Sequence, residues 1–329
     1  MNLRIAIAVC CTLMLVQCAT FRESESQSWK TSKASWNSSY SGQVRQAEGD
    51  APMRERKQPA APARKPAAGK QKSPKPAVAT AQGQGQRSAE AFELNGMISA
   101  DMWDELFPNR LGRKAGSDRS DFYSFAAFVE AAKRFPRFLH EGGEVQRRRE
   151  LAAFLAHLAQ ETGGFRYLEQ LTVTRSYSVA NKEYSPVDGK EYYGRGPIQL
   201  SYNYNYGQFS DAYFGDKNVL LNNPELLATD SVVSFGSAIW FWMTGQPPKP
   251  SCHDVMVGSW TPGDMDVDAN RQPGFGLTLN IINASQCGKE SEHAQKRYDL
   301  YYKYCSYFGT TKGDNCECAN QLPYGKKSF

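Results

Sequence analysis

Apolar positions divide the chain into three parts. An apolar run over residues 5–16 follows Arg4, residues 19–90 show no regular apolar spacing, and beyond them apolar and aromatic residues recur at helical intervals up to Tyr324. The pattern therefore predicts an N-terminal segment (1–18), a tether (19–90) and one folded domain (91–329). A domain of this length can bury a sizeable core.

Four stretches of the domain have the i, i+3, i+4, i+7 apolar spacing of a buried helical face. Ser120 is placed to cap the first helix and Pro136 to end it, and Gly163, Gly245 and Gly309 lie where the other three should stop. The apolar positions of the four helices are, in chain order, Phe125, Phe128, Val129 and Ala132; Leu151, Phe154, Leu155 and Leu158; Phe235, Ala238, Ile239 and Trp242; and Tyr298, Tyr301, Tyr302, Cys305 and Phe308.

The signal for β-strands is weak. Apolar and polar residues alternate clearly only over residues 165–173. No internal repeat is visible. We therefore predict a mainly α fold.

Composition and charge exclude several classes of function. The 329 residues are 40% hydrophobic and carry a formal net charge of +5, which does not favour a nucleic-acid partner. No apolar run reaches the roughly 20 residues of a membrane-spanning helix. The chain has no glycine-rich phosphate loop and no paired CxxC motif, and its four histidines (His140, His157, His253 and His293) are scattered. We expect no metal ion and no cofactor.

The N-terminal segment has the features of an export signal. Residues 15–18 (Leu-Val-Gln-Cys) resemble a bacterial lipobox, in which Cys18 would be acylated and attach the protein to a membrane. Gln17 stands where a lipobox has a small residue, so an ordinary signal cleaved near Ala19 is the alternative. The domain is thus expected to be exported, either secreted or held as a lipoprotein that faces the periplasm or the cell exterior.

The tether is rich in Ser, Lys, Gln, Ala and Pro. Such a composition cannot bury enough apolar surface to offset the entropy of the chain, so we predict disorder. As a random coil it would reach about 45 Å. Its positive charge either binds an anionic wall or membrane or simply keeps the tether solvated.

Glu161 is a candidate for acid catalysis. It lies seven residues after Phe154 and three after Leu158, so the helical period places it on the buried stripe. A carboxylate there is costly unless it is paired or protonated. A protonated carboxyl is what a general acid needs. The alternative is a glutamate in the last helical turn that only bonds a neighbour.

A second carboxylate follows the turn at residues 163–164. In an extended segment, Phe165, Tyr167, Glu169 and Leu171 would share one face. Two carboxyl groups across a cleft are the groups that hydrolyse glycosidic bonds. Alternatively, Glu169 is a solvated surface charge.

Tyrosine and asparagine alternate over residues 202–206, directly after a glycine-rich segment at 192–201. Flat rings can stack on the apolar face of a sugar, and amides can bind its hydroxyl groups. The alternative is a turn followed by a tyrosine-rich core.

Six segments of the domain form an ordered set of motifs: 161–164, 192–207, 238–244, 246–250, 273–276 and 280–283. Together they resemble glycoside hydrolase family 19, the plant-type endochitinases, with the short loops of bacterial members, and the resemblance covers residues 94–324. It implies a lysozyme-like, two-lobed helical domain with a cleft for chitin or a related β-1,4-linked N-acetylglucosamine polymer, and endo-acting cleavage with inversion. We also expect a monomer.

The resemblance assigns roles to individual residues. It makes Glu161 the general acid and Glu169 the general base, and it implies that Ser201 helps to hold the attacking water. Residues implied to contact the substrate are Tyr184, Gln199, Tyr204, Asn205, Gln246, Lys249, Asn283 and Arg297.

Three positions depart from the family pattern. Gln160 stands in place of a histidine before the acid, and Tyr184 in place of a tryptophan in the cleft. Gln286 stands in place of an acidic residue that pairs with Arg297, so we expect Arg297 to lack that partner. Both carboxylates are present, so we still expect activity, with altered tuning of acid and base.

Five cysteines follow the signal, namely Cys252, Cys287, Cys305, Cys316 and Cys318. In an exported domain this number indicates at least one disulfide and leaves at least one free thiol. Cys305 lies on an apolar helical stripe, so we predict a buried free thiol there. The resemblance pairs Cys287 with Cys318 and leaves Cys252 and Cys316 open.

Two alternatives to an endochitinase remain. One is a peptidoglycan hydrolase, which a tether near the cell wall would suit, provided that the cleft has room for the lactyl ether of muramic acid. The other is an inactive sugar-binding module, which the departures at Gln160 and Gln286 leave open and the presence of Glu161 and Glu169 opposes.

Overall fold

The structure is a computed structural model that describes residues 94, 96–111, 121–173 and 175–326. The predicted export signal, the lipidation at Cys18, the tether, the start of the domain and the cap at Ser120 lie outside these residues. The described residues belong to one compact unit, Gln84–Phe329. None of their helices is both long and apolar enough to cross a membrane.

Helices account for the regular structure of the described residues, so the predicted mainly α fold is confirmed. The only β-pairing in this part of the chain is in isolated bridges. The helices are α2 (Ala100–Leu106), α3 (Phe125–Ala132), α4 (Glu144–Thr162), α5 (Asn203–Phe214), α6 (Asn218–Asn222), α7 (Leu226–Thr229), α8 (Ser231–Met243), α9 (Cys252–Val257), α10 (Asp264–Asp268), α11 (Phe275–Asn283) and α12 (Glu292–Tyr307), with a 3-10 turn at Ala284–Gln286.

Capping residues explain where two of these helices start and stop. The cap of α3 is Ser124, whose side chain accepts a hydrogen bond from the amide of Ala127, and not the predicted Ser120. Helix α4 ends, as predicted, at Gly163, which has a left-handed backbone (φ 62°). The backbone N–H of Gly163 donates a hydrogen bond to the carbonyl of Ala159.

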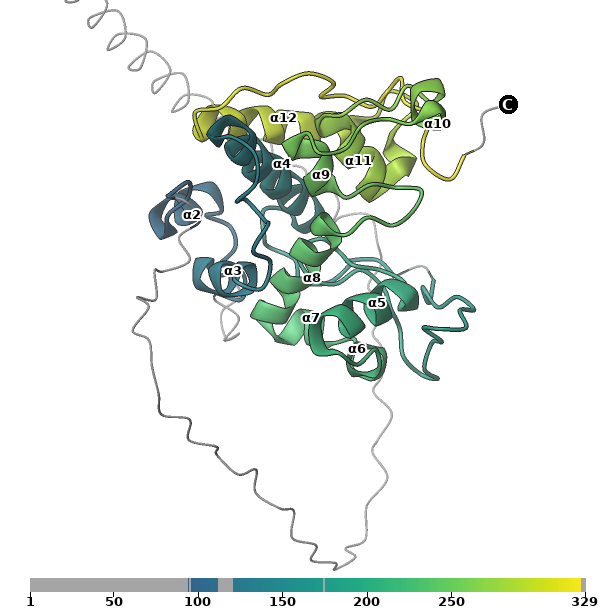
Figure 1. Cartoon of the computed structure of the whole chain (residues 1–329). Helices are drawn as coiled ribbons and strands as arrows, with labels where there is room; N and C mark the ends of the chain where they lie inside the picture. The colour runs from purple at the N-terminus through teal and green to yellow at the C-terminus, as the bar shows by residue number, and fades with distance from the viewer. Residues whose placement is uncertain (1–93, 95, 112–120, 174, 327–329) are drawn as a thin grey trace, which may run out of the picture. The chain divides into compact units, whose positions relative to one another are not determined.

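The helices form two groups joined by α8 (Figure 1). Helices α4, α9, α11 and α12 lie together, α5 to α7 form the other group, and α8 contacts α3, α5, α7 and α9. In the core, the buried ring of Trp103 stacks on Phe128 with centroids 5.1 Å apart and meets Phe235 at 5.8 Å. Such rings contribute much of the buried apolar area of a domain.

The strand predicted over residues 165–173 does not form. Gly163, Gly164 and Phe165 all have positive φ, so the chain turns sharply and buries the Phe165 ring beside Trp103. Leu171, predicted to share a face with Phe165, is 72% exposed. The alternation was misleading because the left-handed turn breaks the two-residue period of an extended chain.

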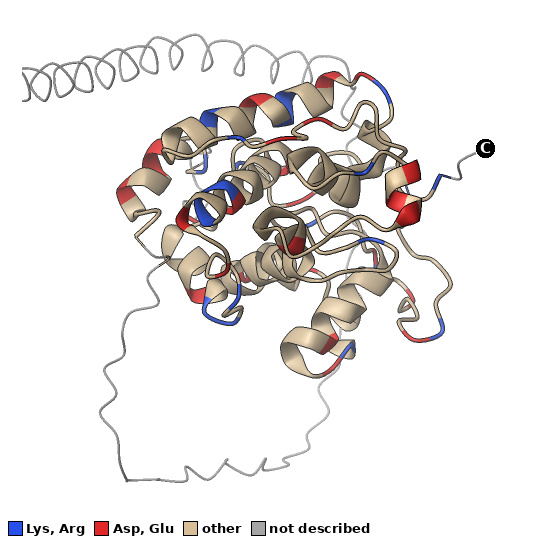
Figure 2. Cartoon of the chain, turned by 45° about the horizontal axis from the view of Figure 1, so that its top comes forward, with Lys and Arg blue, Asp and Glu red and all other residues tan. Residues whose placement is uncertain are grey.

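A disulfide joins Cys287, after the 3-10 turn, to Cys318 near the C-terminus. Cys252, Cys305 and Cys316 are free and buried. On the surface, basic and acidic side chains are interspersed along the helices in Figure 2, with no face of a single sign in that view.

Candidate active site

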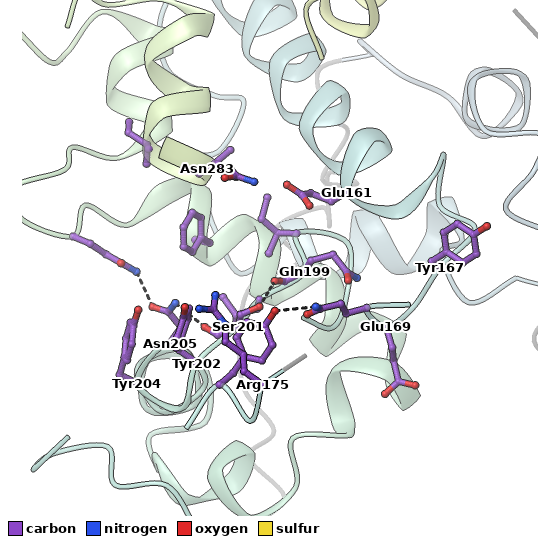
Figure 3. Close-up of a pocket in the computed structure, with 18 of the residues that line it drawn as sticks. Glu161, Tyr167, Glu169, Arg175, Gln199, Ser201, Tyr202, Tyr204, Asn205 and Asn283 are labelled. Atoms are coloured by element: carbon purple, nitrogen blue, oxygen red, sulfur yellow. Dashed lines mark hydrogen bonds between the residues drawn. The ribbon is translucent and has the colours of Figure 1, made fainter. Parts of the chain in front are cut away.

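A cavity of about 720 Å³ lies between the end of α4, the loop after it, the turn before α5 and the end of α11 (Figure 3). Its lining combines carboxylates, amides, hydroxyls and aromatic rings. Nine residues predicted from the sequence line it, namely Glu161, Glu169, Gln199, Ser201, Tyr204, Asn205, Gln246, Lys249 and Asn283.

Glu161 enters the cavity from the last turn of α4 (Figure 3). Its side chain is 20% exposed and forms an ion pair with Arg297 of α12, whose side chain is 2% exposed. The predicted buried stripe therefore ends at the cavity wall: Leu158, one turn earlier, is fully buried, whereas Glu161 reaches solvent.

Arg297 lies behind the cavity wall, and each of its three side-chain nitrogens contacts a different residue. Its Nη2 donates to Glu161, its Nε donates to Oε1 of Gln286 at 3.1 Å, and its Nη1 is 3.2 Å from Nδ1 of His157. As expected, Arg297 has no acidic partner at position 286, but the Gln286 amide oxygen still accepts a hydrogen bond from it. Gln286 brings no charge, so the Arg297 guanidinium has one carboxylate partner among the described residues, Glu161.

The tautomer of His157 follows from its neighbours. The hydroxyl of Thr278 donates its one proton to the carbonyl of Phe275 at 2.7 Å, so it must accept from Nε2 of His157 at 2.9 Å. The Nδ1 atom is then the acceptor for Arg297. Burial, together with the charge of Arg297, holds the pKa of His157 well below its usual value, so the ring is neutral.

Sequence reasoning considered His157 only as a metal ligand and missed this role. Its position four residues before Glu161 was the available signal, since residues i and i+4 lie on the same side of a helix.

Glu169 lies on the loop after α4 and its side chain is 41% exposed. The hydroxyl of Tyr193 and Nε of Arg195 both donate to its Oε1, at 3.0 and 3.1 Å. Figure 3 shows its carboxylate directed away from Glu161. The two carboxylates therefore lie on separate elements of one cavity, and each is bound by an arginine.

Ser201 lies in a turn with unusual backbone angles. Gln199 and Tyr202, on either side of it, have φ of 51° and 74°, which residues other than glycine rarely adopt. The Ser201 hydroxyl donates to the carbonyl of Gln199 at 3.0 Å, and its own carbonyl accepts from the Asn205 amide at 2.9 Å. The turn holds the serine at the cavity surface, and strained backbone of this kind often occurs at functional sites.

Two cationic residues complete the lining. The Nζ of Lys249 donates to the carbonyl of Ile281 at 2.9 Å, and burial lowers the pKa of this amine. Arg175, which sequence reasoning did not select, lies over the rings of Tyr177 and Tyr202 with its guanidinium carbon 4.7 and 5.4 Å from their centroids. No sequence motif indicated it, because it depends on how the loop folds over the tyrosines.

Tyr184, predicted to stack on the substrate, does not line the cavity. Its ring packs against α5 so closely that a Cβ on Gly207 would lie 2.4 Å from it. The glycine leaves the space that this ring fills, so Tyr184 is a packing residue in this structure. Arg297, also predicted to bind substrate, is behind the lining and reaches the cavity only through Glu161.

Comparisons with known proteins agree with one another. Residues 97–318 match the model of the family described as chitinase class I. Endochitinase 3 of Solanum tuberosum is 44% identical over 248 residues, which cover 71% of this chain and 77% of that protein. Inactive chitinase-like protein 1 of Hevea brasiliensis is 43% identical over 249 residues, which cover 71% and 78%. The crystal structure of the class IV chitinase from Zea mays aligns with a TM-score of 0.55 and 30% identity, over 68% of this chain and 98% of that chain.

Proposed function

The chain belongs to glycoside hydrolase family 19, the class I chitinases, and we propose that it cleaves internal β-1,4 bonds of chitin with inversion at the anomeric carbon. The observation that carries the proposal is that Glu161 and Glu169 line one cavity from separate elements. Family membership alone does not decide activity, because a relative of similar identity is named inactive.

The proposed mechanism uses one carboxyl group as acid and the other as base. A water molecule attacks the anomeric carbon while the bond from that carbon to the bridging oxygen breaks. Glu161, in its protonated form, gives a proton to the leaving oxygen, and Glu169 takes a proton from the water. Inversion requires the carboxyl groups to be roughly 6.5–9.5 Å apart, so that the water fits between base and sugar. Ser201, whose hydroxyl lies at the cavity surface, helps to hold that water.

The polar lining residues suit an N-acetylated sugar. Amide groups come from Gln199, Asn205, Gln246 and Asn283, and they can donate to and accept from acetamido and hydroxyl groups. The ring of Tyr204 stacks on Tyr202 with centroids 5.4 Å apart and offers an apolar surface for a pyranose face. The cavity volume is in the range typical of ligand sites.

The decisive experiment is incubation with soluble N-acetylglucosamine oligomers and, in parallel, with purified peptidoglycan. We expect shorter oligomers from the first substrate and no soluble muropeptides from the second, with the α-anomer as the earliest product by proton NMR. Release of muropeptides would make the protein a peptidoglycan hydrolase. Binding of oligomers without cleavage would make it a sugar-binding module, and a β-anomer would exclude inversion.

We also propose that residues 1–18 direct export and that residues 19–90 tether the domain. Mass spectrometry of the mature N-terminus separates acylation at Cys18 from cleavage near Ala19. A shortened chain that begins at Ala91 should melt cooperatively and cleave soluble oligomers as fast as the longer chain. Loss of cooperative melting would place the start of the domain earlier.

A further inference from the structure

We propose that Tyr193 and Arg195 are positioning residues: they anchor one oxygen of Glu169 and leave the other free to accept the proton of the attacking water. The inference rests on the proposed function, in which Glu169 is the base. Neither residue lines the cavity, so each acts through Glu169.

Glu169 needs such an anchor because of where it lies. It is on a loop without regular structure, and its side chain is 41% exposed. An exposed glutamate that nothing holds samples several rotamers, and ordering it costs free energy in each catalytic cycle. A base that hydrogen bonds already hold in one orientation avoids this cost.

Arg195 is suited to be the fixed part of the anchor. Its side chain is only 6% exposed. Its Nη1 donates to the carbonyl of Glu191 at 2.9 Å and to the hydroxyl of Tyr206 at 3.1 Å, while Nε points at Glu169. Three acceptors in different directions leave the guanidinium little freedom. Glu169 is also its only carboxylate partner among the described residues, and an unpaired buried charge would be costly.

Tyr193 provides the second donor. The Arg195 guanidinium carbon lies 3.7 Å from the centroid of the Tyr193 ring, so the two side chains stack and present neighbouring donors. Burial raises the pKa of Tyr193, so its hydroxyl keeps the proton that it donates to Glu169.

Both donors bind Oε1, and no donor from the described residues binds Oε2. One carboxylate oxygen is therefore held while the other keeps its lone pairs available. The backbone is held as well: the amide of Gln170 donates to Gly194 at 2.8 Å, and the amide of Gly196 donates to Leu168 at 2.9 Å. These backbone hydrogen bonds join the segment that contains Glu169 to the segment that contains its two donors.

The main test is Tyr193→Phe, which removes only the hydroxyl that binds Glu169 and keeps the ring that stacks on Arg195. We expect kcat to fall about tenfold, the scale of a hydrogen bond to a charged group, with KM and the melting temperature unchanged. The matched control is Tyr192→Phe. The Tyr192 hydroxyl donates to Leu221 and accepts from Val187, away from Glu169, so its loss should lower the melting temperature and leave kcat unchanged. An unchanged kcat in Tyr193→Phe would overturn the proposal.

A second test asks whether Tyr193 acts through Glu169. In a Glu169→Ala background supplied with azide, the anion attacks the anomeric carbon without needing a base. Tyr193→Phe should then have no further effect on the rate, and an equal tenfold loss in this background would overturn the proposal. Arg195→Lys keeps the charge but loses the planar group that reaches three acceptors, so kcat should fall at least as far as in Tyr193→Phe.

Failure of the proposed function would give results different from failure of the anchoring role. If the unmodified protein does not cleave oligomers, or if Glu169→Gln is as active as the unmodified protein, Glu169 is not the base. If the protein cleaves oligomers and Glu169→Gln is impaired while Tyr193→Phe is not, only the anchoring role is wrong.

Discussion

The two carboxylates of the cavity have the same kind of partner but are built into the molecule in different ways. Glu161 is paired with Arg297, and both lie on long helices, α4 and α12, that pack against each other. Glu169 is paired with Arg195, and both lie on irregular segments held together by an isolated bridge. The Glu161 side chain is about half as exposed as that of Glu169.

The difference indicates how each half of the site keeps its geometry. On the helix side, apolar packing fixes the backbone, and Arg297 binds only groups that are already in place. On the loop side, hydrogen bonds to Oε1 of Glu169 and backbone hydrogen bonds between the two segments hold the geometry. A helix in a packed core has little alternative structure, whereas a loop has many conformations of similar energy. Substitution of Glu161 should therefore change the chemistry alone, and substitution of Glu169 should change both the chemistry and the order of its loop.

The largest expected effect is that of Glu161→Gln. The amide keeps the shape of the side chain and a contact to Arg297 but has no proton to give to the leaving oxygen. We expect kcat to fall about 10³-fold or more with little change in oligomer binding, because the proton matters mainly in the transition state. The measurement pairs steady-state kinetics with calorimetric titration of the oligomer. A nearly active variant would exclude Glu161 as the acid.

Glu169→Gln should be severe but milder than Glu161→Gln. Water remains a weak nucleophile without a base, so kcat should fall about 10²-fold, and azide should restore part of the rate. Because the variant also loses the ionic partner of Arg195, hydrogen exchange of the loop at residues 165–173 should become faster. Equal protection in the variant and the unmodified protein would mean that the loop does not depend on this ion pair.

The same contrast explains which parts could be predicted from the sequence. The position of Glu161 follows from local helical spacing, so it could be predicted from the sequence. The same holds for α4 and for its end at Gly163. The prediction that Phe165 and Leu171 share one face was wrong, because the left-handed turn at residues 163–165 breaks the alternation of an extended chain. The contact of His157 with Arg297 was not predicted: the i, i+4 spacing places His157 on the same side of α4 as Glu161, but the contact itself requires α4, α11 and α12 to meet. Tyr184 was misplaced for a similar reason, since its burial depends on Gly207 of another element.

Gln286→Glu tests the helix side with a smaller change. A second carboxylate at position 286 would share Arg297 with Glu161 and bring a negative charge close to the acid. We expect the basic limb of the pH profile of kcat to move to higher pH, with less than a tenfold change in its maximum, because a proton is harder to remove near an anion. The control is Gln295→Glu, which adds the same negative charge at an exposed position of α12, outside the 3-10 turn that holds Gln286. An unchanged pH profile in Gln286→Glu would mean that Arg297 does not influence the ionisation that limits kcat.

The smallest expected effect concerns stability and again belongs to the helix side. The fully buried His253 of α9 donates through Nδ1 to Glu150 of α4 at 2.6 Å and through Nε2 to Glu141 at 3.0 Å. Burial alone would lower the pKa of His253, but the two carboxylates outweigh it and raise the value. Hydrogen bonds from Arg137 and His253 lower the pKa of Glu141 to about 2. The loop side has no such group, since residues 165–206 contain no histidine.

The sign of the pH dependence follows from these directions. Because the folded pKa of His253 is raised, its contribution is fully present below the unfolded value of about 6.5 and is lost as the pH rises through the folded pKa. For Glu141 the contribution is present above its unfolded value of about 4.3 and is lost as the pH falls toward 2. The melting temperature should therefore fall by about 2–4 °C above neutral pH, which is the scale of about 1 kcal/mol for a domain of this size. His253→Gln should remove this alkaline decline, whereas the exposed His293→Gln should keep it. An alkaline decline that survives in His253→Gln would mean that another group loses its proton on unfolding, and that the buried contact between α4 and α9 does not depend on the charge of the imidazole.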